Sequence, residues 1–296
     1  MKRDFFIGLD GGGTKTKLIL EDAEGKRLAD SIGGPANIRL SVEKAWQSIH
    51  GALESALQKA KLSLDDPDIR YHAGLGLAGT EIRAACQSFL ARPHPFATLA
   101  LESDAYVACL GAHEGKDGAI IIVGTGVVGY QIEKGRKTKV GGWGFPHSDE
   151  GGGAWLGMEA VRHTLQWLDG RIAKSELLEE IYAHFDRDLE KLVIWANEAN
   201  ASYFAQMAPL VIKHLQAKDT WSVALLKMAV REIEEIDQAL VCASTQKNFC
   251  CLFGGIAPYV QPYVCRSLRK RIIPRKHDAA KGALFMIRNQ VLGRPL

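Results

Sequence analysis

The sequence has no long apolar run and no strong excess of charge. No apolar stretch reaches the roughly 18 residues that a membrane-spanning helix needs. The apolar residues near the start are interrupted at Asp10, too early for a secretory signal. The net charge of +3 argues against a nucleic-acid-binding face, and we interpret the densest basic cluster, Arg266 to Lys276, as a solvated helix end and loop. These features predict a cytoplasmic protein that binds neither membranes nor nucleic acids.

The sequence also lacks a paired cysteine motif. Its six cysteines include no C-x-x-C pair, and Cys250 and Cys251 lie inside an apolar run. We therefore expect all six to be small buried side chains in a reducing compartment, and neither disulfides nor zinc ligands.

An apolar strand that ends in an acid and leads into three glycines is the most informative stretch. Phe5 to Leu9 is mostly apolar, Asp10 ends it, and Gly11 to Gly13 follow. Glycines accept backbone angles that other residues avoid, and they let a ligand approach bare N–H groups. Such a turn can bind phosphate oxygens, and Asp10 is well placed to hold a divalent cation through water. Taken alone, the stretch is also compatible with a plain glycine-rich hairpin.

This turn does not match the two common nucleotide motifs. Gly8 and Gly13 have the spacing of P-loop glycines, but Thr14 and Lys15 stand in reversed order. The P-loop and the dinucleotide fingerprint both lead into a helix. Here residues 15–21 are β-branched and partly alternating, which predicts a second strand instead.

The same order of elements begins again near Gly115. An apolar strand leads to the turn Gly124-Thr125-Gly126, and a second strand, a hairpin turn and a third strand follow. The glycine-rich stretch 141–153 is too polar to pack as a core element, and residues 174–244 are mostly helical. The further predicted strands are 27–32, 71–77, 97–101, 119–123, 127–133, 138–140, 249–253 and a short one at 272–273, and the further predicted helices are 41–61, 81–91, 102–111, 154–168, 256–269 and 278–291.

The two repeats, which each contain a glycine-threonine turn, resemble the nucleotide-binding superfamily of actin, hexokinase and Hsp70. The individual motifs are most similar to those of the BadF/BadG-type amino-sugar kinases, namely glucosamine kinase and N-acetylglucosamine kinase. The matching segments, in the family's order over nearly the whole chain, are DGGGTKT at Asp10, GPAN ending at Asn37, ESDA around Asp104, GTG at Gly124, GGWG at Gly141, SDEGGG from Ser148 and FGGI at Phe253.

The resemblance implies an α/β fold of two ribonuclease-H-like domains, of the actin/hexokinase type, around a central cleft. The expected domains are residues 1–113 and 114–277, with a C-terminal helix at about 278–296 that packs back on the first. It also suggests a homodimer.

The resemblance further implies ATP and Mg²⁺ as cofactors and assigns roles to particular residues. Asp104 would be the catalytic base, and Asp10 would hold Mg²⁺ through water. The implied binding residues are Gly11, Gly12, Gly13, Thr14, Lys15, Thr125 and Gly126 for the phosphates, Gly254 and Gly255 for the adenosine, and Asn37, Gly142, Trp143 and Asp149 for the sugar.

Four of these residues also have structural interpretations. Asp104 is compatible with a helix N-cap, Asp149 with a cap or turn residue, Trp143 with core packing and Asn37 with an Asx turn.

The implied reaction is phosphorylation of glucosamine at its 6-hydroxyl by ATP, giving glucosamine 6-phosphate and ADP. N-acetylglucosamine is the close alternative substrate, and glucose is a more distant one. Other classes remain open: an ATPase that activates a reductase partner, a sugar-sensing regulator, and an actin-like filament protein. One departure from the family is Val127-Val128 after the second turn, where a small polar residue is usual. It removes one hydroxyl contact to phosphate or sugar.

Overall fold

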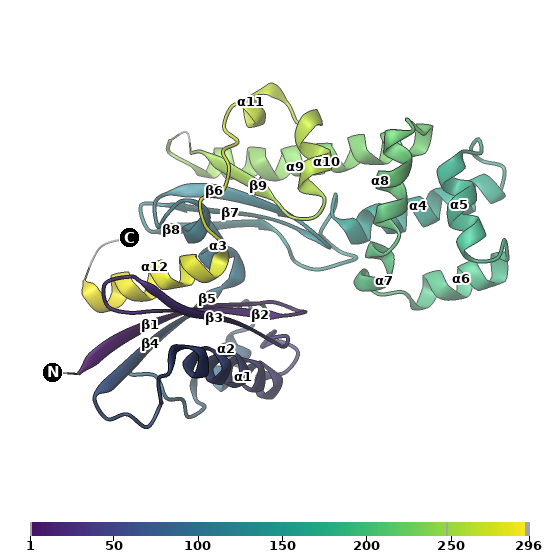
Figure 1. Ribbon diagram of the computed structural model, residues 1–296. Coiled ribbons are helices and arrows are strands. Elements are labelled where there is room, and N and C mark those ends of the chain that lie inside the picture. Colours follow the sequence, from purple (N-terminus) through teal and green to yellow (C-terminus); the bar gives the residue numbers. More distant parts are fainter. Residues whose placement is uncertain (1, 247, 294–296) are drawn as a thin grey trace. The chain divides into compact units, whose positions relative to one another are not determined.

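The computed structural model describes residues 2–246 and 248–293 (Figure 1). The chain divides into two compact units. Unit 1 contains the described residues of 1–118, 131–137 and 274–296, and unit 2 those of 119–130 and 138–273. Within these described residues no helix combines the length and the apolar character that crossing a membrane requires.

Unit 1 is built on a mixed five-stranded sheet with helices on both faces. The sheet has the order β3-β2-β1-β4-β5, in which β1 runs antiparallel to β2 and parallel to β4. Helix α1 packs on one face, whereas α12 and α3 pack on the other (Figure 1). The elements are β1 Arg3–Gly11, β2 Thr16–Glu21, β3 Arg27–Gly33, α1 Val42–Ala60, β4 Ile69–Leu77, α2 Arg83–Leu90, β5 Thr98–Ser103, α3 Asp104–Ala112 and α12 Ala279–Leu292.

Local sequence explains where α1 begins and ends. The side chain of Ser41 accepts a hydrogen bond from the N–H of Lys44, which is the expected N-cap. Lys61 ends the helix in the left-handed conformation. The apolar residues at helical spacing, among them Ile49, Leu53 and Leu57, are buried against the sheet.

Helix α12 packs against the sheet through glycines that leave no room for a side chain. A Cβ atom at Gly8 would lie 2.1 Å from the carbonyl oxygen of Ala280, and one at Gly74 would lie 2.2 Å from that of Ala283. Gly282 of α12 approaches α3 equally closely, because its Cβ would lie 1.8 Å from the carbonyl oxygen of Val107. Gly8 is therefore required for helix packing.

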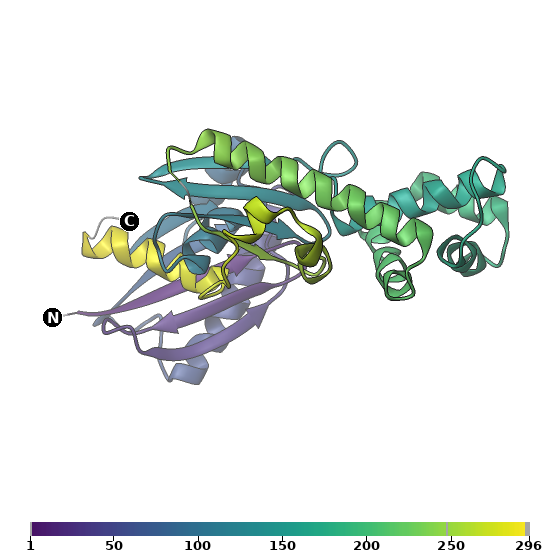
Figure 2. The same ribbon diagram turned by 90° about the horizontal axis from the view of Figure 1, so that it is seen from above.

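Unit 2 is built on a four-stranded sheet of order β8-β7-β6-β9. Helix α9 lies along one face of this sheet (Figure 2). It comes close to β7 at Gly129, where a Cβ atom would lie 2.5 Å from Cγ2 of Ile236. The elements are β6 Gly118–Val123, β7 Val127–Glu133, β8 Arg136–Gly141, α4 Gly153–Leu168, α5 Glu176–His184, α6 Leu189–Glu198, α7 Ala201–Ala205, α8 Ala208–Gln216, α9 Thr220–Ala243, β9 Cys250–Phe253, α10 Ala257–Val260 and α11 Arg266–Arg269.

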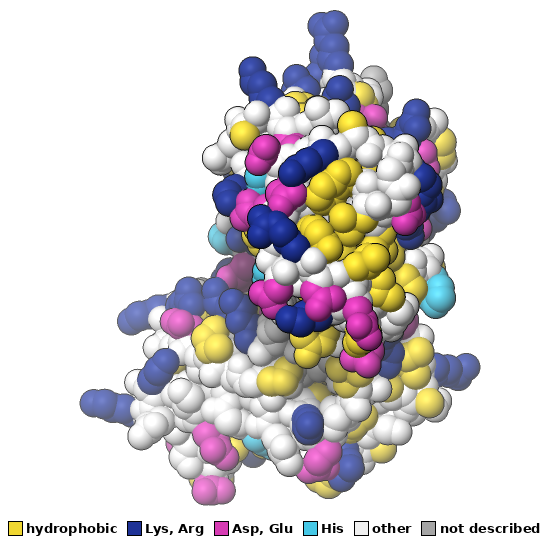
Figure 3. Space-filling view, turned by 90° about the vertical axis from the view of Figure 1, so that its right-hand side faces the viewer, with side chains coloured by type: hydrophobic (Ala, Val, Ile, Leu, Met, Phe, Trp, Pro, Cys, Tyr) yellow, Lys and Arg dark blue, Asp and Glu magenta, His cyan; other side chains and the backbone are white. Residues whose placement is uncertain are grey.

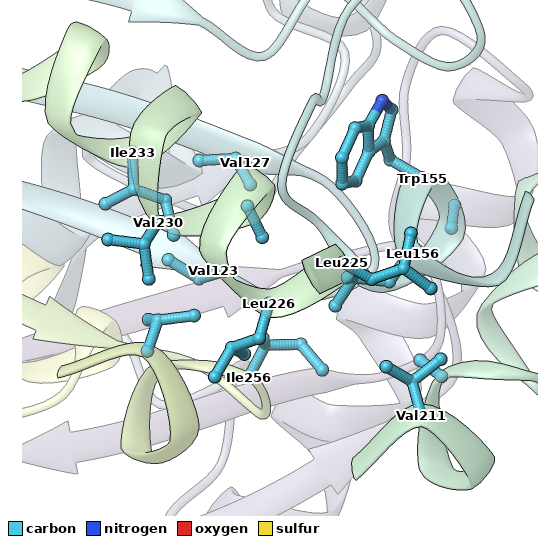
Figure 4. Close-up of a cluster of buried hydrophobic side chains, with 14 of the residues drawn as sticks. Val123, Val127, Trp155, Leu156, Val211, Leu225, Leu226, Val230, Ile233 and Ile256 are labelled. Atoms are coloured by element: carbon cyan, nitrogen blue, oxygen red, sulfur yellow. The ribbon is translucent and has the colours of Figure 1, made fainter. Parts of the chain in front are cut away.

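The core of unit 2 lies directly behind the second glycine-threonine turn. Val123 and Val127, on either side of that turn, belong to the same buried cluster as Leu226 and Val230 of α9 and Leu156 of α4 (Figure 4). The turn is therefore anchored at both ends in packed apolar side chains.

Most predicted elements are confirmed to within a few residues, and the errors have local causes. The predicted helix from 256 to 269 is three short pieces, because Pro262 lacks a donor and Val264 is extended. The predicted strand at 272–273 is a single bridge from Ile272 to Cys250.

The prediction of six buried cysteines is wrong for Cys242 and Cys265, which are exposed. Cys109, Cys250 and Cys251 are buried, Cys86 is half-buried, and all six are free thiols.

Candidate active site

The turn between β1 and β2 is the first part of the candidate site, and it lies in unit 1. The N–H of Gly12 donates to the carbonyl of Lys15 (3.0 Å), and the N–H of Ala36 donates to the carbonyl of Gly12 (2.9 Å). A Cβ atom at Gly11 would lie 2.6 Å from Leu77 and 2.8 Å from the Cβ of Ala36, so only glycine fits there. Residues 13–15, at the tip of the turn, are exposed. The backbone is thus fixed at its base and accessible to a ligand at its tip.

Three carboxylates influence one another beside this turn. Burial, together with the negative charges of Asp104 and Asp278, raises the pKa of Asp10 to about 6, against the opposing charges of Lys15 and Lys17. Although burial opposes the effect, hydrogen bonds from Lys17 and from the N–H of Lys281 hold the pKa of Asp278 below its usual value. The Nζ atom of Lys17 lies 2.5 Å from Oδ2 of Asp278. Asp10 and Asp104, predicted as metal ligand and base, therefore share one electrostatic environment.

Asp104 follows β5 directly and is the first residue of α3. The N-cap of this helix is Ser103, whose hydroxyl accepts from the N–H of Tyr106 at 3.1 Å. Oδ1 of Asp104 accepts from the N–H of Ala105 at 2.8 Å. The capping role considered for Asp104 thus belongs to its neighbour, and the carboxylate lies at the positive end of the α3 dipole.

The acids around Asp10 fit a divalent cation. A carboxylate whose pKa is raised by burial and by neighbouring negative charge is stabilised when a cation offsets that charge. Among the residues that the structure describes, no three His, Cys, Asp or Glu side chains are grouped so as to hold a metal by themselves. In proteins Mg²⁺ usually keeps several waters and binds through one or two carboxylates and substrate phosphates.

Asn37 forms an Asx turn, the structural interpretation with which its sequence is compatible. Its Oδ1 accepts from the N–H of Arg39 at 3.0 Å, and a Cβ atom at Gly79 would lie 2.6 Å from the same oxygen. The hydroxyl of Thr16 donates to the carbonyl of Gly34 at 2.7 Å, which ties β2 to the same loop. Asn37 is therefore held rigidly near the first turn.

In unit 2, the turn Gly124–Gly126 is held by the segment that begins α4. The N–H of Gly153 donates to the carbonyl of Gly124 (2.8 Å), and the N–H of Ala154 donates to that of Thr125 (2.9 Å). Oδ1 of Asp149 accepts from the N–H of Val127 at 3.3 Å. Asp149 also has a positive φ of 74°, so the turn interpretation of this residue is confirmed.

The third glycine turn follows β9 and lies against the end of β6. Gly254 has a φ of +117°, and its Cβ would lie 2.2 Å from the carbonyl oxygen of Val123. The same carbonyl accepts from the N–H of Ile256 at 3.0 Å. Gly255 has open space around its Cα, so this turn is accessible from outside.

An acidic cavity of about 300 Å³ opens beside the glycine-rich loop of unit 2. Its wall includes Trp143 and Asp149 as well as three further carboxylates, Glu150 from the loop and Glu232 and Glu235 from α9. Burial raises the pKa of Glu232, and the negative charges of Glu235 and Glu150 add to the effect. This cavity thus concentrates negative charge around an aromatic ring.

Trp143 is 67% exposed, so it does not fill the core. The ammonium group of Lys139 lies 4.2 Å from its ring centroid and also donates to the carbonyl of Gly142 at 2.9 Å. Gly142 itself has a φ of +67°, and its Cβ would lie 2.8 Å from Val128. The loop therefore presents its indole to solvent on a fixed backbone.

Sequence reasoning missed two features of the site. Asp278 was predicted only as the start of a helix, because no motif links it to Asp10. Glu232 and Glu235 were assigned to an ordinary helix, and their only signal was two acids three residues apart on one helix face.

The comparisons with known proteins agree with this architecture. The model of the BadF/BadG/BcrA/BcrD ATPase family matches residues 7–286. Glucosamine kinase GspK of Vibrio cholerae is 36% identical over 283 residues, which is 95% of each chain. The crystal structure of a putative N-acetylglucosamine kinase from Chromobacterium violaceum is 33% identical, with a TM-score of 0.87, and the match covers 97% of this chain and 99% of that one.

A more distant structure, the ROK hexokinase of Thermus thermophilus, has 20% identity and a TM-score of 0.54, and the match covers 98% and 99% of the two chains. It shows the fold, which confirms the predicted α/β architecture of the actin/hexokinase type. With a family model that spans almost the whole chain and a relative at 36% identity, the protein belongs to the BadF/BadG/BcrA/BcrD ATPase family.

Proposed function

We propose that the protein is a glucosamine kinase, which transfers the γ-phosphoryl group of ATP to the 6-hydroxyl of glucosamine. The names of its relatives narrow the substrate class to amino sugars. The V. cholerae relative is called a glucosamine kinase, and the C. violaceum structure a putative N-acetylglucosamine kinase. The choice between the two sugars depends on the cavity beside Trp143.

The acidic cavity of unit 2 is the observation that supports glucosamine. Near neutral pH the 2-amino group of glucosamine carries a positive charge in much of its population, whereas the acetamido group of N-acetylglucosamine is neutral. The carboxylates of Glu150, Glu232 and Glu235 attract a cation, and their mutual repulsion is relieved when one binds. The indole of Trp143, over which the ammonium group of Lys139 lies, suits the C–H surface of a sugar.

Phosphoryl transfer from ATP to a sugar hydroxyl requires that the two reactants are aligned and that the negative charge of the phosphates is neutralised. Asp104 accepts the proton of the 6-hydroxyl, while the backbone N–H groups of residues 11–14 bind the phosphate oxygens. Thr125 and Gly126 form the second phosphate turn, Lys15 adds a positive charge, and the Gly254-Gly255 turn leaves room for the adenosine. Asp10 would hold Mg²⁺ through water, and the ion would neutralise phosphate charge. Asn37, Gly142, Trp143 and Asp149 contact the sugar.

A coupled kinase assay over glucosamine, N-acetylglucosamine, glucose and mannosamine tests this function. We expect the highest kcat/KM for glucosamine. Glu235→Gln and Glu232→Gln should each lower kcat/KM for glucosamine by about tenfold and leave that for N-acetylglucosamine within about threefold, because only the charged substrate loses a partner.

The matched control is Glu198→Gln, which removes an exposed carboxylate of α6 and should change neither value. A preference for N-acetylglucosamine, or equal losses on both sugars, would contradict the assignment.

We also propose a cytoplasmic homodimer with domains at 1–113 plus 278–296 and at 114–277. Hydrophobic side chains gather on the side of unit 2 that carries α6 (Figure 3). On that helix Leu189, Val193 and Ile194 are 39–52% exposed, which is unusual for a surface helix. Light scattering should give twice the chain mass for the wild type, and Ile194→Lys should return it to one chain.

A further inference from the structure

The carboxylate of Asp149 joins the glycine-rich loop of unit 2 to its phosphate turn. Oδ1 accepts from the N–H of Val127, the residue directly after Gly126. The backbone carbonyl of Asp149 accepts from the N–H of Gly152 at 3.0 Å, so both ends of the residue are fixed. Because Asp149 has a positive φ, it is held in a conformation that costs an ordinary residue free energy.

The two segments lie in close contact on both sides. A Cβ atom at Gly126 would lie 2.5 Å from the carboxyl carbon of Asp149. A Cβ atom at Gly152 would lie 2.7 Å from the carbonyl oxygen of Thr125. Together with the backbone bonds from Gly153 and Ala154, these contacts join residues 149–154 to the turn 124–127. The two segments are therefore joined by both backbone hydrogen bonds and close packing.

We propose that Asp149 is a positioning residue for the second phosphate turn, so that the sugar loop and the nucleotide-binding turn respond to each other's ligands. This inference rests on the proposed function, which assigns the turn to phosphate and the loop to sugar. A sugar that engages the loop fixes the carboxylate, and the carboxylate fixes the N–H of Val127 and the turn before it. By linkage, nucleotide on the turn must tighten sugar binding by the same factor, which for such couplings is typically about 5-fold or more.

Two substitutions separate the acceptor oxygen from the charge. Asp149→Asn keeps an oxygen that can accept from Val127 but removes the charge, whereas Asp149→Ala removes both. Gly126→Ala keeps the carboxylate and pushes it away, because the new methyl group would collide with it. His147→Ala, an exposed change in the same loop, is the matched control.

Calorimetric titration with a non-hydrolysable ATP analogue and Mg²⁺, with and without saturating glucosamine, measures the coupling. The wild type and His147→Ala should bind the analogue about fivefold tighter when sugar is present. Asp149→Ala and Gly126→Ala should bind it about tenfold more weakly without sugar and gain nothing from sugar. Asp149→Asn should bind the analogue within twofold of the wild type, although its sugar affinity falls.

The inference is overturned if Asp149→Ala and Gly126→Ala bind the analogue as the wild type does, or if Asp149→Asn loses as much nucleotide affinity as Asp149→Ala. Thermal melting checks that each variant is folded, and Asp149→Asn keeps the test valid if the alanine variant is not. A failure of this inference can be distinguished from a failure of the proposed function. A protein that phosphorylates no amino sugar, but whose Asp149→Ala variant binds the analogue weakly without sugar, keeps the link between loop and turn and refutes the kinase assignment.

Discussion

Replacing Asp10 by asparagine should make the ligand-free protein more stable while abolishing its activity. Asp10 is largely buried at the end of β1, and the charges of Asp104 and Asp278 repel it. Its ionised form is therefore unfavourable in the folded state without a cation. Asparagine has nearly the same shape and no charge, so the variant removes this cost together with the proposed Mg²⁺ contact.

The pKa shift sets the size of the effect. A rise from 3.8 to about 6 corresponds to about 3 kcal/mol, at 1.36 kcal/mol per pKa unit. Because the folded-state pKa is raised, the unfolded chain releases this proton first as pH increases. As the pH rises from about 3.8 to about 6, the wild type therefore loses stability relative to the variant. The advantage of Asp10→Asn should be fully present above pH 6 and vanish near pH 3.8.

Denaturant unfolding of both proteins at several pH values, without nucleotide or Mg²⁺, measures this difference. The control is Asp65→Asn, which replaces an exposed carboxylate and should change the free energy of unfolding by less than about 0.5 kcal/mol. Mg²⁺ with an ATP analogue should stabilise the wild type more than the variant, because only the wild type keeps the acidic partner.

The reasoning is refuted if Asp10→Asn is no more stable than the wild type at pH 7.5. It is equally refuted if the gain is the same at pH 7.5 and pH 4.5, because a packing effect is independent of protonation. A gain that is confined to the higher pH values identifies charge as the cause.

Two further predictions concern the same unit. Asp104→Asn should lower kcat by about 10²-fold with little change in the KM for sugar, and should shift the stability window of Asp10 to lower pH, because one of the repelling charges is gone. Gly282→Ala should cost about 1–3 kcal/mol of unfolding free energy, because its methyl group meets the carbonyl oxygen of Val107, whereas Gly51→Ala on α1, with nothing within 4 Å, should gain up to about 1 kcal/mol in the same assay.

Local chemistry is what made the fold predictable from sequence. The strands around 5–9 and 119–123 are short apolar runs that end at glycines, and β-branched residues follow each turn. Ser41 marked the beginning of α1 because a hydroxyl at the N-cap satisfies an N–H that the helix leaves open. Where the prediction is wrong, after residue 256, Pro262 and the extended backbone at Val264 interrupt an apolar pattern that otherwise predicts one helix.

The electrostatics of the site were beyond sequence reasoning, because they arise from contacts between distant segments. Asp278 influences Asp10 only because α12 packs on β1 through Gly8 and small residues of the helix. Glu232 and Glu235 belong to a helix whose pattern predicts nothing but a buried face, and their proximity to Trp143 depends on how α9 lies on the sheet. A pattern in one segment cannot carry this information.

The duplication within the chain extends beyond the order of strands to the way each turn is held. In unit 1 the carbonyl of Gly12 accepts from the N–H of Ala36, the residue next to Asn37. In unit 2 the carbonyl of Gly124 accepts from the N–H of Gly153, shortly after Asp149. Each candidate phosphate turn is thus hydrogen-bonded to the segment that carries a candidate sugar residue. Because these ties are main-chain bonds within one unit, each unit fixes its candidate sugar residue relative to its candidate phosphate turn through its own contacts.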